Sequence, residues 1–154
     1  MIEYEVVPHI GVGPVRLGMT HDEVIKAMGR QPDIVNGKIT VGCYHRCAFQ
    51  VDYSTGQHIA EYIEISDWPD FIARFDGIDV FHTPAKELVA HIASKTPYDD
   101  TDWELGYSYI FREYDLGLWR PVIPESDEDP DGRYFSTIGV GIKDYYQPRT
   151  PSDH

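Results

Sequence analysis

Apolar and polar residues alternate along several short segments, a period of two that is typical of strands with one buried face. Phe49, Val51 and Tyr53 form one such set, with polar residues between them. This pattern, or a short β-type run, predicts further strands over residues 4–7, 58–65, 105–111, 114–119 and 134–142. We therefore expect a run of short antiparallel strands.

A tight turn is indicated by Asn36-Gly37, which lies between the β-type segments 34–35 and 38–41. Asn-Gly is the pair that a two-residue type I′ turn prefers, because both central residues of that turn need a positive φ. The sequence therefore predicts a hairpin closed by these two residues.

A first helix is predicted from Thr20 to Gly29, where apolar residues recur at helical spacing. Thr20 is a good N-cap, and Glu23 three residues later completes a capping box. Gly29 supplies a stop, because glycine enters the left-handed conformation at least cost. The apolar stripe consists of Val24, Ile25 and Met28.

A second helix is predicted to begin at Thr83-Pro84, with Thr83 as the N-cap and Pro84 at the first helical position. Its apolar stripe consists of Leu88, Val89, Ile92 and Ala93. The preceding apolar segment is ambiguous, and we interpret it as a helical turn over 71–75 followed by a strand over 78–81.

These elements predict an α+β fold, an antiparallel sheet with helices packed on one face. We expect one domain over residues 1–147 and a disordered tail over 148–154. Each predicted helix precedes several strands, which suggests two tandem helix-then-sheet units, 10–66 and 71–143. Coincidence explains this recurrence equally well, because threonine N-caps are common.

The net charge of −13 over 154 residues limits the classes of partner. It argues against nucleic acid, whose phosphates attract lysine and arginine, and against anionic membrane surfaces. A basic protein partner fits better, although acidity that serves only solubility would look the same. No apolar run is long enough to span a bilayer, and residues 1–11 carry no signal-peptide features, so we expect a cytoplasmic protein.

Three soft metal ligands lie close together in Cys43, His45 and Cys47, which would share one face of an extended chain. No fourth ligand lies nearby and the spacing matches no strong zinc pattern, so we predict neither a metal nor another cofactor. Whether the two cysteines form a disulfide is left open. The chain has no Gly-x-Ser-x-Gly, Ser-x-x-Lys or His-Glu-x-x-His motif, so no catalytic residue is predicted.

Acidic and aromatic residues gather in the second half of the chain, in the segment 99–109 and in the acidic stretch 125–131. Tyrosine and tryptophan supply rigid contact area, and carboxylates steer a basic partner toward them. The hypothesis is a non-enzymatic protein-binding module, such as an inhibitor or a toxin-neutralising immunity protein. The predicted contact residues are Asp99, Asp100, Asp102, Trp103, Tyr107, Tyr109, Glu125, Asp127, Glu128, Asp129 and Asp131. The alternatives are an ordinary aromatic core in a scaffold protein, and a small-ligand or metal-dependent enzyme.

The segment 15–29, VRLGMTHDEVIKAMG, resembles the LGMT-x-x-E-V-x-x-x-x-G signature of a loose group of bacterial proteins. That group includes the β-lactamase-inhibitor-protein fold and the small lipoproteins of outer-membrane assembly. The resemblance covers one tenth of the chain and implies helix pairs with antiparallel sheet, in a fold used to bind other proteins. It implies no catalytic residue, and the chain differs from the lipoproteins in lacking a lipidation cysteine at its start.

Overall fold

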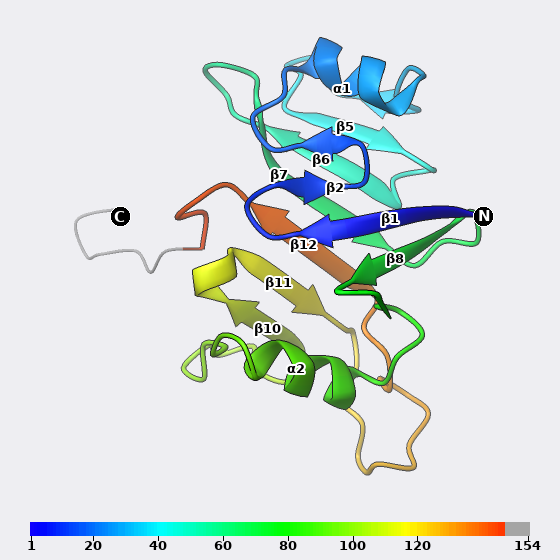
Figure 1. Ribbon diagram of the computed structural model, residues 1–154, viewed down its shortest axis with the longest axis vertical. Helices are drawn as coiled ribbons and strands as arrows, with labels where there is room; N and C mark the ends of the chain where they lie inside the picture. The colour runs from blue at the N-terminus through cyan, green and yellow to red at the C-terminus, as the bar shows by residue number, and fades with distance from the viewer. Residues whose placement is uncertain (147–154) are drawn as a thin grey trace.

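The computed structural model describes residues 1–146, and two β-sheets dominate it (Figure 1). The five-stranded sheet has the order β3 (Val15–Arg16), β2 (Gly11–Val12), β1 (Ile2–Val7), β8 (Phe71–Phe75) and β9 (Ile78–Asp79). The seven-stranded sheet has the order β10 (Ser108–Phe111), β11 (Leu116–Trp119), β12 (Thr137–Gly141), β7 (Ala60–Ser66), β6 (Phe49–Tyr53), β5 (Val41–Tyr44) and β4 (Ile34–Val35). Within residues 1–146 the helices are α1 (His21–Met28), α2 (Ala85–Ala93) and the 3₁₀ turn Arg112–Tyr114.

The expected α+β fold, with helices covering one face of a sheet, is therefore wrong. The two α-helices have only 8 and 9 residues, and they lie at opposite ends of the molecule, with β1, β2 and β8 between them (Figure 1). A second sheet supplies much of the cover instead: the Tyr4 ring of β1 packs 5.1 Å from the Phe49 ring of β6. Two short helices cannot cover a sheet of seven strands.

Long-range pairing joins the two halves of the chain within each sheet. β1 pairs in parallel with β8, and β7 pairs with β12 in antiparallel register. Each half contributes one helix followed by antiparallel strands of the larger sheet, α1 with β4, β5, β6 and β7, and α2 with β10, β11 and β12. The strands of both predicted units thus belong to one continuous sheet.

The seven-stranded sheet has one buried face and one outer face. Alternation along β6 buries Phe49, Val51 and Tyr53, as predicted, and leaves the residues between them partly exposed. On the outer face, Gly139 of β12 lies under the ring of Tyr62. On the outer face, the Tyr62 ring therefore covers the backbone of β12 at this glycine.

The local sequence signals match the structure around α1 and differ from it at residues 71–75 and at the start of α2. Thr20 caps α1 in a capping box with Glu23, and Gly29 ends it with φ 76°, as predicted. Residues 71–75 form a strand rather than a helical turn, because their alternate side chains are buried between the sheets. The N-cap of α2 is Pro84 and not Thr83, and no side chain caps it.

The predicted hairpin at Asn36-Gly37 forms with a longer loop. Ile34 pairs with Cys43 and Val35 with Gly42, and residues 36–40 connect the two strands. The Asn36 side chain accepts hydrogen bonds from the backbone N–H groups of Thr40 and Val41, at 2.8 and 3.1 Å. Asparagine closes this loop through its side chain, which a two-residue type I′ turn does not require.

No helix within residues 1–146 combines the length and the apolarity needed to cross a membrane. The predicted tail, 148–154, lies outside the described residues.

Candidate functional site

Two loops at one end of the seven-stranded sheet carry the predicted contact residues. Residues 99–107, which we call the Trp103 turn, precede β10, and residues 121–132, which we call the acidic loop, connect β11 to β12. The guanidinium of Arg120 joins them, because its Nε donates to the carbonyl oxygen of Gly106 at 2.7 Å and its Nη1 to that of Gly132 at 2.9 Å. The two loops are thus held side by side.

Side-chain hydrogen bonds fix the shape of the Trp103 turn. The Asp99 carboxylate accepts from the backbone N–H and the hydroxyl of Thr101, and from two nitrogens of Arg112 at 2.9 and 2.7 Å. The Asp102 carboxylate accepts from the backbone N–H of Glu104 at 3.0 Å. These local bonds pre-order the backbone on both sides of Trp103.

Trp103 is 90% exposed, the highest exposure of any large apolar side chain in the described residues. On the same two loops and at the end of β11, four further apolar side chains are each between 39% and 44% exposed: Tyr107, Trp119, Val122 and Ile123. Tyr107 belongs to the same turn, and Val122 and Ile123 belong to the acidic loop. The two loops therefore present an apolar surface within an acidic region.

The acidic loop is folded around one of its own carboxylates. Asp129 accepts hydrogen bonds from the backbone N–H groups of Glu125 and Asp131, at 3.0 and 2.9 Å. These bonds lower the pKa of Asp129. The remaining carboxylates of the loop point to solvent, and Asp127 reaches Lys86 of α2 at 3.2 Å.

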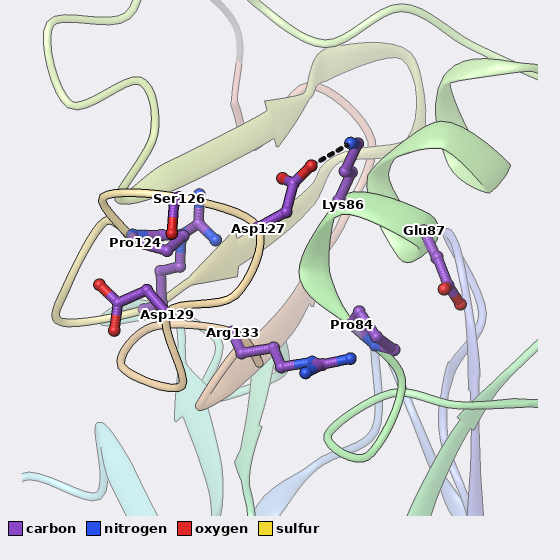
Figure 2. A pocket seen from close by; sticks show the side chains of 9 residues that line it. Pro84, Lys86, Glu87, Pro124, Ser126, Asp127, Asp129 and Arg133 are labelled. Carbon is purple, nitrogen blue, oxygen red and sulfur yellow. Dashed lines mark hydrogen bonds and ion pairs between the residues drawn. The ribbon is translucent and has the colours of Figure 1, made fainter.

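A shallow cavity of about 240 Å³ lies between the acidic loop and the start of α2. Lys86 and Asp127 face each other across it, and Arg133 extends toward Pro84 (Figure 2). General acid catalysis needs a carboxyl group whose pKa is raised, and the pKa shift of Asp129 beside this cavity is downward. Burial does raise the pKa of Asp52 and Glu64, but these residues lie on β6 and β7 and do not line the cavity.

The structure divides the predicted contact residues into two groups. Exposed on the two loops are Asp100, Trp103, Tyr107, Glu125, Asp127, Glu128 and Asp131, with Asp102 and Asp129 partly exposed. The Asp99 carboxylate forms an ion pair with Arg112, and the Asp99 side chain is only 13% exposed. Tyr109 packs against the rings of Tyr98 and Phe135. Asp99 and Tyr109 therefore support the surface rather than form it.

Cys43, His45 and Cys47, which were weak candidates for metal ligands, do not lie on an extended chain. Tyr44 pairs with Phe49, and residues 45–48 form the turn between β5 and β6. His45 bonds the Tyr4 hydroxyl at 2.9 Å. Within residues 1–146 no group of three or more histidine, cysteine, aspartate or glutamate side chains is placed to hold a metal ion.

Arg120 is the supporting residue that the sequence pattern missed. It is only 7% exposed, and its guanidinium lies 5.5 Å from the centre of the Phe135 ring. An arginine at the end of a strand usually extends into solvent, so nothing in the local pattern marks this one as buried.

Comparison of the chain with protein-family models, curated proteins and solved structures found no match.

The Asp99 ion pair predicts a specific dependence of stability on pH. Thr101 and Arg112 lower the pKa of Asp99 from 3.8 to about 2. The folded-state pKa lies below the unfolded one, so this stabilisation is complete above about pH 4 and disappears as the pH falls through 2. In thermal melts, the Tm difference between wild type and Asp99→Asn should be largest near pH 6 and shrink toward pH 2.

The neighbouring Asp100→Asn change is the matched control, because Asp100 is exposed on the same turn. Its Tm difference from wild type should stay small and nearly constant with pH. A gap between wild type and Asp99→Asn that persists unchanged at pH 2 would contradict the role of the Asp99 carboxylate.

Proposed function

We propose that this chain is a non-enzymatic protein-binding module, whose contact surface consists of the Trp103 turn and the acidic loop. The observation that carries the proposal is a tryptophan 90% exposed on a turn that side-chain hydrogen bonds hold in place. Leaving a large apolar side chain in water forgoes about 2 kcal/mol or more of burial free energy. A rigid aromatic anchor recovers that free energy when a partner covers it, at little cost in conformational entropy.

The charge of the chain supports a basic protein as the partner. The net charge is −13, and exposed carboxylates on both loops surround the apolar residues. Acidic groups around an aromatic centre increase the association rate with a basic surface and disfavour acidic competitors. Within this proposal, the chain acts in the cytoplasm as an inhibitor or immunity protein that neutralises a toxin with a basic surface.

Capture of a partner from host lysate on the immobilised chain tests the anchor. Trp103→Ala should reduce the amount of the specifically captured protein at least tenfold, because central aromatic anchors carry a large share of binding energy. Ile34→Ala is the matched control: Ile34 is 61% exposed on β4, at the far edge of the sheet from β10. Equal capture by wild type and Trp103→Ala would overturn the proposed surface.

Charge reversal tests the electrostatic part separately, with the captured protein as the probe. The double change Asp100→Lys and Glu128→Lys should slow association about tenfold at low salt, and less at high salt. Neither side chain is used in the loop hydrogen bonds described above. The control double change Glu5→Lys and Asp22→Lys alters the net charge by the same amount at exposed positions elsewhere. Equal on-rates for the two double variants would remove steering by the loops.

A further inference from the structure

The hairpin turn between β5 and β6 has an unusual backbone. Three consecutive residues, His45, Arg46 and Cys47, have φ values of 51°, 53° and 69°. Residues other than glycine rarely adopt this left-handed conformation, because it brings the Cβ atom close to the following carbonyl oxygen. Such a run persists only where other contacts hold it.

Two contacts from other segments hold this turn. The His45 ring bonds the Tyr4 hydroxyl at 2.9 Å, and the Arg46 backbone N–H donates to the Asp33 carboxylate at 2.9 Å. Both connect the turn to parts of the chain distant in sequence. Because Tyr44 pairs with Phe49, the turn has only four residues, and Cys47 on it lies close to the end of β5 that carries Cys43.

The consequence is a pair of neighbouring thiols. The Cys43 thiol donates to the side-chain oxygen of Gln50 at 3.9 Å, and Cys47 lies near enough to help raise the pKa of the Cys43 thiol; both cysteines are free. Cys43 is 5% exposed at the end of β5, whereas Cys47 is partly exposed on the turn. One thiol is thus open to reagents in solution and the other lies behind it.

We propose that Cys43 and Cys47 form a reversible dithiol–disulfide pair, oxidised by a low-molecular-weight disulfide such as glutathione disulfide. The Cys47 thiol loses its proton and attacks one sulfur of the reagent, which releases one glutathione thiol and leaves a mixed disulfide on Cys47. The Cys43 thiol then loses its proton, attacks Cys47 Sγ and releases the second glutathione thiol. Two protein thiols are oxidised to one disulfide, and one reagent disulfide is reduced to two thiols.

The environments of the two thiols set the order of these steps. Burial raises the pKa of the Cys43 thiol to about 12, so it stays protonated and unreactive toward reagents in solution. Cys47 must therefore react first. Closure by Cys43 follows more slowly, driven by its position next to the mixed disulfide.

The disulfide would also stabilise the turn. It closes a short loop around the three left-handed residues and so restricts the unfolded chain. We expect the oxidised protein to melt about 5 °C above the reduced protein.

The test treats the intact chain with glutathione disulfide and follows intact mass over time, with peptide mapping. Wild type should pass through a species carrying one glutathionyl group and end two hydrogens lighter than the reduced protein. Cys43→Ser should retain one glutathionyl group on residue 47, and Cys47→Ser should remain unmodified. Thermal melts establish that both variants are folded.

Three outcomes would overturn the proposal: a wild-type protein that keeps its glutathionyl group, one that does not react, or a disulfide between two chains. None of them bears on the proposed binding surface, since Trp103 and Cys47 lie on different loops.

Discussion

Replacing Gly139 by alanine should destabilise the protein by about 3 kcal/mol and lower its Tm by about 6 to 12 °C. A Cβ atom at this position would lie 2.0 Å from the Tyr62 hydroxyl and 2.4 Å from its Cζ. Neither the β12 backbone nor the Tyr62 ring can move aside at low cost. Gly139 lies in β12 between β7 and β11, and the Tyr62 ring stacks on Tyr145 and hydrogen-bonds Tyr146. Chemical and thermal denaturation measure the loss.

Two further variants separate this clash from a general effect of alanine. Gly56→Ala should change stability by less than about 0.5 kcal/mol, because a Cβ atom there has no neighbour within 4 Å. In a Tyr62→Leu background, Gly139→Ala should cost much less than in wild type, because the opposing ring is gone. Additive losses in the double variant would show that the ring is not the obstacle.

Part of the fold could be read from the sequence because local physics determines it. Thr20, Glu23 and Gly29 act within one helix, so their capping roles follow from spacing alone. Alternation in β6 likewise reports burial directly. The segment 71–75 is apolar at too many positions to distinguish a buried strand from a helical turn, and only its pairing with β1 decides between them.

The arrangement of the two sheets has no comparable local signal. The parallel pairing of β1 with β8 and the antiparallel pairing of β7 with β12 join segments about 70 residues apart. Such contacts depend on the whole core and not on a motif. The resemblance of residues 15–29 to a group of bacterial proteins rests on the cap and stop residues of one helix, so it says little about these sheets.

The candidate surface was predictable in composition but not residue by residue. The alternation over 105–111 suggested that Tyr107 and Tyr109 share an environment. Gly106, with φ 103°, turns the chain before β10 begins at Ser108, so Tyr107 is exposed while Tyr109 packs inward. Asp99 and Asp100 are equivalent in sequence, and only the position of Arg112 shows that Asp99 is a structural group.

Replacing Arg120 by methionine should destabilise the protein by about 3 kcal/mol and loosen both loops of the proposed binding surface. Methionine retains much of the apolar stem, but it leaves the carbonyl oxygens of Gly106 and Gly132 without the hydrogen bonds that the guanidinium donates. Hydrogen exchange should accelerate in residues 99–107 and 121–132, and capture of the partner should decrease with it. Arg120→Lys should fall between, because one ammonium group cannot span both carbonyls as a planar guanidinium does.

Arg133→Met is the matched control for this prediction. Arg133 is exposed and its guanidinium lies over the Tyr134 ring at 5.9 Å, so its loss should cost less than about 0.5 kcal/mol. Unchanged hydrogen exchange in both loops of Arg120→Met would contradict the joining role of Arg120. If exchange rises and capture does not fall, the loops need no fixed shape to bind, and the pre-ordered Trp103 anchor loses its physical basis.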